Sequence, residues 1–375
     1  MSRTAPTDRP AGNGQDDRSV VITGGSAGVG RAIALRFARG GARVAVLGRS
    51  RDGVDSAARE IEAAGGQALA LVADVSDAAA VSAAADEVAR RWGGIDVWVN
   101  NAMVTMYAPV SRMSAEEFRR VTEVTYLGCV HGTMAALTHM RPRDAGVIIQ
   151  IGSALSYRAI PLQSAYCGAK FAVRGFTDAL RSELRRETSG VRITMLQLPA
   201  VNTPQFDWAR TVFPRRPQPV APIFQPEAIA DIVWRASRDV PREVWIGWPT
   251  LKLIAGAALA PGYLDRYLAR EGYDAQLSQE VQPPGQEDNL FGPAEGGHTV
   301  HGRFSARARP SVAAFDPLVA RLAALGVTAA LAGLAALALR RMPDDRRQPS
   351  SPAGSAHRSR SGCAGRGSSR PQRRR

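Results

Sequence analysis

The feature that most constrains the fold is a glycine-rich turn between an apolar segment and a helix-like segment near the start of the chain. The apolar segment SVVIT, residues 19–23, is followed by GGSAGVG. Gly24, Gly28 and Gly30 let the backbone turn sharply and approach a pyrophosphate, and a helix beginning near Gly28 points its amide donors at the phosphates. A plain strand-to-helix turn has the same local pattern. The flanking strand and helix, and a second strand at 43–48, favour dinucleotide binding.

Strand-like and helix-like segments alternate after this turn. Helices are expected at 52–64, 77–92, 114–140, 165–184 and 226–238, and strands at 68–75, 95–102, 146–152, 191–198 and 243–248. Ser114 and Glu117 form a capping-box pattern at the start of the third helix. The alternation predicts an α/β fold with a Rossmann-type, doubly wound parallel sheet, and a ligand site at the carboxyl ends of the strands.

The chain is expected to contain a single catalytic domain with a C-terminal extension. Its 375 residues and 45% hydrophobic content suffice for a substantial core. The expected parts are a disordered leader at 1–17, a catalytic domain at 18–250, an extension at 251–311, an apolar helix at 312–341 and a basic disordered tail at 342–375. The leader lacks the apolar stretch of a secretory signal, which favours a cytoplasmic protein.

The three cysteines, Cys129, Cys167 and Cys363, have no paired spacing for a disulfide framework or a metal site. We therefore expect a reducing compartment and no bound metal. Cys167 adjoins Tyr166, but no basic partner for a reactive thiol is evident, so a small core-facing helix residue is the favoured interpretation.

The net charge of +14 first suggests a nucleic-acid-binding protein, but its distribution argues otherwise. Eleven arginines and two aspartates in residues 340–375 account for +9, which leaves +5 for the other 339 residues. The excess lies in a Ser/Gly/Pro/Arg tail that cannot pack a core and has no interleaved aromatics for stacking on bases. Nucleic-acid binding is therefore not expected.

Three residues carry the expected chemistry. Tyr166 and Lys170 are four residues apart on an expected helix, so both side chains project from one face. A neighbouring ammonium favours the phenolate, so Lys170 would lower the tyrosine pKa from its free value of ~10. Ser153, at the end of a strand, offers a hydroxyl to the same substrate oxygen. Alone, this spacing is common on solvated helix faces, and only the context makes it informative.

The end of the second strand indicates which nicotinamide cofactor is used. An acidic residue there would bind the free 2′-hydroxyl of NAD, and a basic residue accommodates the 2′-phosphate of NADP. The sequence has Gly48, Arg49 and Ser50 at this point, so NADP(H) is predicted. Arg49 as a solvated loop charge is the alternative. Asp74 and Val75, at the end of the third strand, are expected beside the adenine.

In this order, these motifs resemble the classical short-chain dehydrogenase/reductase family, over roughly residues 19–248. The resemblance rests on TGGSAGVG at 23–30, Asp74, NNA at 100–102, Ser153, and Tyr166 with Lys170. It implies that an alcohol and a carbonyl compound are interconverted by hydride transfer. Ser153 would orient the substrate oxygen, Tyr166 would exchange the proton, and Lys170 would also hold the nicotinamide ribose.

The resemblance also implies a set of cofactor-binding residues and a homo-oligomeric state. Pro199 and Thr203 would cover the nicotinamide. The full expected set is Gly24, Ser26, Gly28, Val29, Gly30, Arg49, Ser50, Asp74, Val75, Asn101, Tyr166, Lys170, Pro199 and Thr203.

Two residues depart from the family pattern. Thr125 stands where the family often has an asparagine that supports a proton relay, and a hydroxyl cannot replace both the donor and the acceptor of an amide. Thr125 is thus a candidate catalytic residue with an altered relay. Met103 replaces the glycine usual after NNA, which either narrows the substrate mouth or serves packing.

The last third of the chain is expected to set substrate choice. Residues 205–227, rich in proline and aromatics, predict a lid, and residues 251–264 either line the site or pack against a neighbouring subunit. Both favour an apolar or bulky alcohol or ketone. The apolar run at 322–339 is near the minimum length for spanning a bilayer, and contact with a membrane surface or packing on protein remain alternatives.

A different class of function is also considered, namely a catalytically weak NADP-binding sensor or scaffold. Thr125 and the appended tail motivate this alternative. The intact set of Ser153, Tyr166 and Lys170 argues against it.

Overall fold

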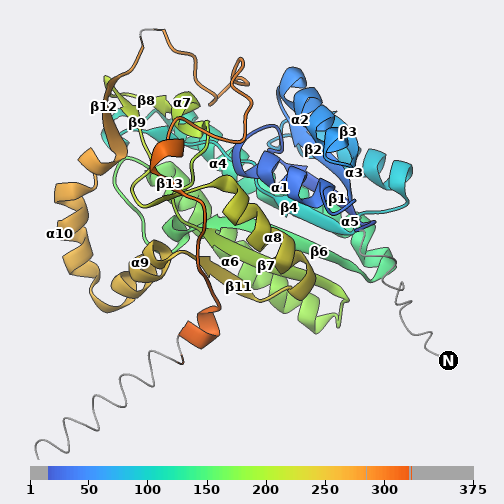
Figure 1. The fold of residues 1–375 in the computed structure, drawn as a ribbon. Coiled ribbons are helices and arrows are strands. Elements are labelled where there is room, and N and C mark those ends of the chain that lie inside the picture. Colours follow the sequence, from blue (N-terminus) through green and yellow to red (C-terminus); the bar gives the residue numbers. More distant parts are fainter. Residues whose placement is uncertain (1–15, 284, 321, 323–375) are drawn as a thin grey trace, which may run out of the picture. The chain divides into compact units, whose positions relative to one another are not determined.

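The computed structural model describes residues 16–283, 285–320 and 322. The chain divides into two compact units, 1–321 and 322–375, and only Leu322 of the second is among the described residues. The first unit is built on an eight-stranded sheet with the order β14-β11-β7-β6-β4-β1-β2-β3 (Figure 1). Its strands are β1 (Ser19–Thr23), β2 (Arg43–Gly48), β3 (Gln67–Val72), β4 (Val97–Asn100), β6 (Gly146–Ser153), β7 (Val191–Leu198), β11 (Glu243–Ile246) and β14 (Ala314–Phe315).

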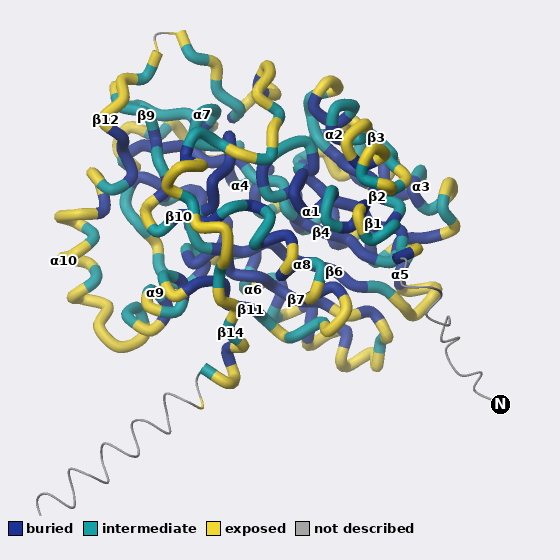
Figure 2. The backbone as a smooth tube through the Cα atoms, viewed as in Figure 1, coloured by how far each residue is buried: buried dark blue, intermediate teal, exposed yellow. Residues whose placement is uncertain are grey.

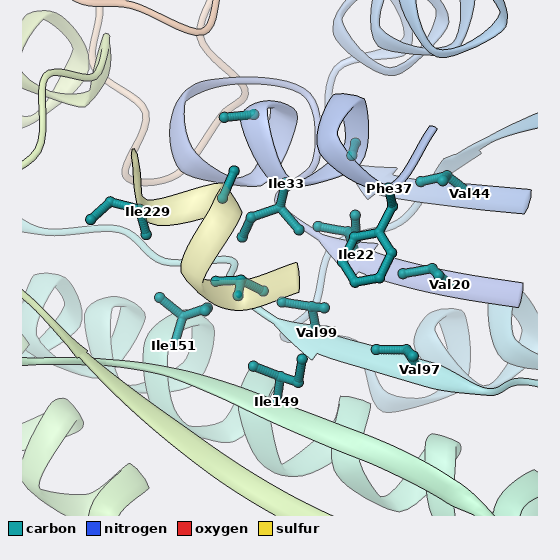
Figure 3. Close-up of a cluster of buried hydrophobic side chains, with 14 of the residues drawn as sticks. Val20, Ile22, Ile33, Phe37, Val44, Val97, Val99, Ile149, Ile151 and Ile229 are labelled. Carbon is teal, nitrogen blue, oxygen red and sulfur yellow. The ribbon is translucent and has the colours of Figure 1, made fainter. Parts of the chain in front are cut away.

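Helices cover both faces of this sheet. On one face lie α1 (Gly28–Ala38), α2 (Arg51–Ala63) and α8 (Pro226–Asp239), and on the other lie α3 (Ala78–Trp92), α4 (Ala115–Thr122), α5 (Gly128–Met140) and α6 (Ser164–Arg186). Val20 and Ile22 of β1 point toward α1 and α8 (Figure 3), while Val21 packs in the opposite layer. The strands are apolar on both sides, as a parallel sheet buried between helices requires. The predicted doubly wound fold is confirmed.

The strand order places a ligand site at one point of the sheet. All neighbouring strands are parallel except β11 and β14. The chain builds β1, β2 and β3 toward one edge and then crosses to β4 on the other side of β1. Ligands of open α/β sheets bind outside the carboxyl ends of the strands where the order reverses. The turn after β1 and the residues after β4 meet at this point.

The long helix expected at 114–140 consists of α4, a π-helical segment η2 (Glu123–Leu127) and α5. The predicted capping box is present, since the Ser114 hydroxyl accepts from the Glu117 amide at 3.1 Å and Glu117 accepts from the Ser114 amide at 2.8 Å. Thr125 lies in the π-helical segment, where the helical hydrogen-bond pattern is interrupted.

Residues 271–311 are more ordered than their loop-like composition suggested. The lid contains α7 (Gln205–Trp208) and three strands. These are β8 (Arg210–Thr211), which pairs with β5 (Met106–Tyr107), β9 (Arg215–Pro217), which pairs with β12 (Leu277–Val281), and β10 (Ile223–Phe224), which pairs with β13 (Ala308–Arg309). The extension thus supplies two of the strands that hold the lid. Sequence patterns miss such short pairings because their stability depends on tertiary contacts.

The segment 248–271 forms α9 (Trp248–Leu259) and α10 (Pro261–Glu271), which have few buried residues (Figure 2). The short 3-10 helices are η1 (Val110–Arg112), η3 (Arg141–Arg143), η4 (Ala154–Ser156), η5 (Asp274–Gln276) and η6 (Ser305–Arg307). Leu253 and Leu268 line the central cavity, whereas Leu259 is 85% exposed. Both interpretations of 251–264 therefore stay compatible with the structure.

The apolar helix expected at 312–341 is wrong at its start. Ala314 and Phe315 form β14, an antiparallel edge strand on β11, and helical residues begin only at Pro317. The rest of the apolar run and the basic tail, 323–375, lie outside the described residues. Among the described residues, no helix is both long and apolar enough to span a membrane. These same residues also contain no group of three or more His, Cys, Asp or Glu that could hold a metal ion.

Candidate active site

A cavity of about 500 Å³ lies at the carboxyl ends of the sheet strands. It brings together residues from the glycine turn, from the ends of β2, β3, β4, β6 and β7, and from α6. Nearly all the predicted site residues line it, namely Gly24, Ser26, Gly28, Val29, Arg49, Ser50, Asp74, Val75, Asn101, Ser153, Tyr166, Lys170, Pro199 and Thr203. Gly30 and Thr125 do not.

The glycine turn has the geometry that a dinucleotide needs. Gly24 and Gly28 have φ angles of +65° and +56°, which favour glycine. A Cβ on Gly30 would lie 2.1 Å from the Gly24 carbonyl oxygen. The absence of a side chain at Gly30 therefore allows α1 to pack closely against the turn. The Asn101 side-chain amide donates to the carbonyls of Thr23 and Gly24 at 3.0 and 3.2 Å and fixes the turn to the end of β4.

The start of α1 faces the cavity without a side-chain cap. Its N-cap residue, Ala27, offers no side-chain acceptor, and the first amide of the helix, that of Gly28, donates to the Thr299 carbonyl at 2.9 Å. Such a helix start favours anions. Together with the close backbone approach at the turn, it fits the pyrophosphate of a nicotinamide dinucleotide.

The adenosine end of the cavity is shaped by the ends of β2 and β3. Ser50 caps α2, and its hydroxyl accepts from the Gly53 amide at 3.1 Å. The Arg49 guanidinium donates to the carbonyls of Asn289 and Phe291 at 2.5 and 3.3 Å. Arg49 is thus not a solvated loop charge. The structure ends β2 at Gly48, so Arg49 and Ser50 stand at the strand end, as the sequence predicts, and neither is acidic.

Asp74 is held by an ion pair that the sequence did not reveal. Its carboxylate lies 2.5 Å from the Arg120 guanidinium and accepts from the amide and hydroxyl of Ser76 at 2.9 and 2.8 Å. Burial raises the pKa of Asp74. The hydrogen bonds from Arg120 and Ser76, together with the positive charge of Arg120, outweigh burial and lower the pKa. Asp74 is therefore an anion that fixes the wall of the adenosine end.

The three residues expected to carry the chemistry share one wall of the cavity. Tyr166 and Lys170 project from the first turns of α6, and Ser153 ends β6 beside them. The Lys170 ammonium donates to the Ile151 carbonyl at 2.7 Å and lies 5.6 Å from the centroid of the Tyr166 ring.

The pKa of Tyr166 is raised, not lowered as the sequence suggested. Burial raises it strongly, and a hydrogen-bonding interaction with Ser153 only partly offsets this effect. In this state the phenol is neutral and carries its proton. The ammonium of Lys170, which donates to the Ile151 carbonyl, does not offset the effect of burial on this pKa.

Ser153 is positioned by hydrogen bonds that run through the buried Gln197 to the half-buried Glu243. Its amide donates to the Gln197 side-chain oxygen at 2.9 Å, and the Gln197 amide donates to Glu243 at 2.7 Å. The Ser153 hydroxyl accepts from the Leu155 amide at 3.1 Å. The end of β6 is therefore tied to β7 and β11, which gives the serine a fixed direction.

Thr125 does not join the cavity, and the catalytic role considered for it is not supported. Its hydroxyl donates to the Val104 carbonyl at 2.9 Å and accepts from the Val104 amide at 3.1 Å. The Val104 backbone thus takes the single donor of the hydroxyl and one of its acceptor sites. Thr125 positions the segment after β4, and its neighbour Val124 lines the cavity instead.

The substrate end of the cavity has largely apolar walls. Met103, Val104, Tyr107, Ile160, Val220, Leu253 and Leu268 line it. Two buried amides add a polar edge, since the Gln163 side chain donates to that of Gln276 at 2.8 Å. Gln276 belongs to the extension, and its loop-like sequence context gave no signal for this role.

Four more extension residues were not foreseen, namely Asn289, Pro293, Ala294 and His298, which line the nucleotide end. Their segment has neither an apolar period nor a known motif. Its contribution follows from long-range contacts, such as the hydrogen bonds from Arg49 to the Asn289 and Phe291 carbonyls, that local sequence patterns do not encode.

Lys170 gives a testable pH dependence. Burial lowers the pKa of Lys170 to about 8 from its ordinary value of 10.5. Between these pH values the unfolded chain holds a proton that the native protein lacks, so the free energy of unfolding rises with pH, by up to about 1.4 kcal/mol per pH unit. Urea denaturation across this range should show the rise relative to Lys170→Met. The exposed Lys252, replaced by Met, is the control that should retain it; parallel curves for wild type and Lys170→Met would contradict the buried lysine.

Comparison with known proteins assigns the family. The sequence model for the family described as short chain dehydrogenase matches residues 18–211. An uncharacterized oxidoreductase of Bacillus subtilis, YxnA, is 29% identical over 318 residues, 84% of this chain and 89% of that protein. The 3beta-hydroxysteroid dehydrogenase 1 of Eggerthella lenta is 34% identical over 254 residues, 66% of this chain and 95% of that protein.

A solved structure supports the same assignment. The crystal structure of levodione reductase is 27% identical, has a TM-score of 0.52, and is covered over 93% of its chain by 60% of this one. The match to YxnA is longer than the expected catalytic domain, so it includes part of the extension. The fold, the glycine turn and these similarities lead to one conclusion: this chain is an oxidoreductase that belongs to the short-chain dehydrogenase family.

Proposed function

We propose that the protein interconverts an alcohol and a ketone or aldehyde by hydride transfer with NADP(H). The observation that carries the proposal is one continuous cavity, which joins the glycine turn to the wall with Ser153, Tyr166 and Lys170. A dinucleotide lying along it would bring its nicotinamide end to Tyr166. The bound nucleotide supplies or accepts the hydride, and the protein provides orientation and proton transfer.

The residues of the wall have distinct roles in this proposal. Tyr166 holds its proton in the free protein, because burial raises its pKa. It can therefore donate that proton to the carbonyl oxygen during reduction and take it back during oxidation. Ser153, whose direction is fixed through Gln197, accepts or donates a hydrogen bond at the same oxygen. Lys170 holds a positive charge beneath the phenol below its pKa of about 8, which favours the tyrosinate formed after the transfer.

The substrate is proposed to be an apolar, bulky alcohol or ketone. The walls beyond Tyr166 are formed mainly by aliphatic and aromatic side chains, including Met103, Tyr107 and Leu253. Two similar proteins are named for a hydroxysteroid and for levodione, and these names support an alcohol or a carbonyl group as the reacting centre. A cytoplasmic, homo-oligomeric enzyme stays our prediction from the sequence.

A direct test is nucleotide consumption. The purified chain is mixed with NADPH or NADH and a panel of ketones and aldehydes of graded size, and absorbance of the reduced nicotinamide is followed. We expect NADPH to be oxidised with the larger apolar ketones. The absence of carbonyl-dependent oxidation with either nucleotide across the panel would contradict the proposal.

Arg49 is proposed to determine the preference for NADP(H). Ser26 and Ser50 lie beside it in the cavity, and α2 begins at the next residue, so a 2′-phosphate would meet a cation, two hydroxyls and a helix start. Arg49→Ala should raise the dissociation constant of NADPH by about 10- to 100-fold, the loss expected for a charge-assisted hydrogen bond, with NADH much less affected. Titration of the nicotinamide fluorescence measures both constants. Equal losses for the two nucleotides would show that Arg49 does not contact the 2′-phosphate.

A further inference from the structure

The extension crosses the nucleotide end of the cavity. After β12 the orange segment in Figure 1 runs across the molecule toward α1 and α2. We call residues 286–303 the clamp. Four clamp residues, Asn289, Pro293, Ala294 and His298, form part of the cavity wall. Leu290 is completely buried among the side chains of the main core, which anchors the clamp at that point.

The clamp bonds to groups that a nucleotide phosphate would use. The Gly28 amide at the start of α1 donates to the Thr299 carbonyl at 2.9 Å. Arg49 donates to the carbonyls of Asn289 and Phe291 at 2.5 and 3.3 Å. Carbonyl and phosphate oxygens are both acceptors and compete for these donors.

The two donors differ in how strictly they compete. Gly28 has one N–H, so its bond to Thr299 and a bond to a phosphate exclude each other. Arg49 has five N–H donors and can hold the clamp carbonyls while it binds a phosphate. The clamp must therefore release Gly28 when a nucleotide takes that amide, whereas Arg49 can join clamp and nucleotide.

The middle of the clamp packs against the first turn of α2. The His298 ring packs on Gly53, where a Cβ would lie 2.9 Å from the His298 Cγ. Its Nε2 donates to the Ala294 carbonyl at 3.1 Å, and the ring lies 5.3 Å from that of Trp208. The buried Arg31 donates to the His298 carbonyl. These contacts leave the clamp closed over the nucleotide end.

The clamp is also tied to the lid of the substrate end. The Asn289 amide donates to the Trp208 carbonyl at 3.0 Å, and Arg303 pairs with Asp207. Asp207 and Trp208 belong to α7. Displacement of the clamp therefore disturbs α7, which links the two ends of the cavity.

We propose that residues 286–303 form a clamp over the adenosine half of the nucleotide site, and that a nicotinamide nucleotide binds and leaves only when this clamp releases Gly28. The clamp then closes again, with Arg49 holding both its carbonyls and the nucleotide. This inference rests on the proposed function only in that the cavity binds a nicotinamide nucleotide.

A reversible lock tests the clamp in the full chain. Gly53 and His298 are both replaced by cysteine, because a Cβ at Gly53 would lie 2.9 Å from the His298 Cγ, which is one bond from the His298 Cβ. A disulfide needs Cβ atoms ~3.5 to 4.5 Å apart. Gly53 does not have a positive φ, so a side chain is compatible with its backbone. Cys129 and Cys167 are buried and stay in every form, and Cys363, which lies outside the described residues, is replaced by serine in every form. The oxidised and reduced forms then share one sequence, and mass spectrometry confirms the bond.

Stopped-flow nicotinamide fluorescence measures NADPH association with both forms. We expect association with the oxidised protein to be slower by about tenfold or more, because a lock removes the open population, and dithiothreitol should restore the rate. The two single-cysteine variants should show no such redox effect. Equal rates in the oxidised and reduced forms would overturn the clamp while leaving the proposed function intact. Failure of wild type to bind either NADPH or NADH would overturn the proposed function itself.

A second variant loosens the clamp and does not depend on the disulfide. Arg303→Gln removes the charge that pairs with Asp207, and NADPH release should accelerate by about tenfold, the effect of one partly buried charge-assisted bond. Arg309→Gln, at an exposed arginine of β13, is the matched control and should keep the wild-type release rate. Equal release rates in the two variants would contradict the clamp.

Discussion

Tyr166→Phe should lower turnover with any ketone substrate by about 10²- to 10⁴-fold, the usual contribution of a positioned general acid or base. The phenol is buried, neutral and beside Ser153, so its removal takes away the proton donor while the shape of the cavity is preserved. The dissociation constant for NADPH should not change. Steady-state kinetics and fluorescence titration of the same preparation separate the two effects.

Tyr126→Phe is the matched control for this substitution. Tyr126 lies in the π-helical segment, outside the residues that line the cavity, so loss of its hydroxyl should leave turnover at the wild-type rate. Full activity of Tyr166→Phe would refute the proposed proton donor. A loss of NADPH binding equal to the loss of turnover would show instead that Tyr166 serves the nucleotide.

Gly30→Ala should disable the nucleotide turn. The added methyl group would lie 2.1 Å from the Gly24 carbonyl oxygen and 2.5 Å from the Asn101 side-chain nitrogen, so the backbone must shift. We expect the free energy of unfolding to fall by about 1 to 3 kcal/mol, as for other overpacked sites. NADPH affinity should fall by about tenfold or more, since each 1.4 kcal/mol of strain carried into the bound state is a factor of ten. Urea denaturation and fluorescence titration measure the two losses.

Gly175→Ala provides the control, because it makes the same change within helix α6. Nothing lies within 4 Å of the added Cβ there. Replacement of a helical glycine by alanine at such a site should raise the free energy of unfolding by about 0.5 to 1 kcal/mol. If Gly30→Ala is as stable as Gly175→Ala and binds NADPH as well, the turn does not depend on the close approach of Gly30 to the Gly24 carbonyl.

The sheet and its helices could be predicted because their signals are local. Apolar strands such as β1 and β6, and amphipathic helices such as α6, show their periods within one segment, and glycines mark the turn between β1 and α1. The strand order then follows from the few topologies that right-handed crossovers allow. These elements predict that the cavity lies at the carboxyl ends of the strands.

The parts of the candidate site that sequence motifs form could be predicted from the sequence. The turn at Gly24–Gly28, the strand end at Ser153 and the helix with Tyr166 and Lys170 all line the cavity. Electrostatic details were not predictable from spacing. The pKa of Tyr166 is set mainly by burial, and the ammonium of Lys170, which donates to the Ile151 carbonyl, does not offset that effect.

The extension was the largest omission. Its strands β12 and β13 pair with the lid, and Arg49 bonds to the clamp, across long distances in sequence. The ion pair of Asp74 with Arg120, outside the extension, also joins residues far apart in sequence. Short paired segments with no apolar period contain no local signal for such contacts. Thr125 illustrates the same limit, because its partner, the Val104 backbone, could not be read from either segment.

Transfer of deuterium tests the central claim most directly. NADPH that carries deuterium at both C4 positions of the nicotinamide is incubated with the purified chain and the panel ketone that is reduced fastest, and the alcohol is analysed by mass spectrometry. Direct hydride transfer predicts one deuterium on the carbinol carbon for each NADPH oxidised, and almost no product with Tyr166→Phe. Oxidation of NADPH without deuterium in an alcohol product would contradict the account.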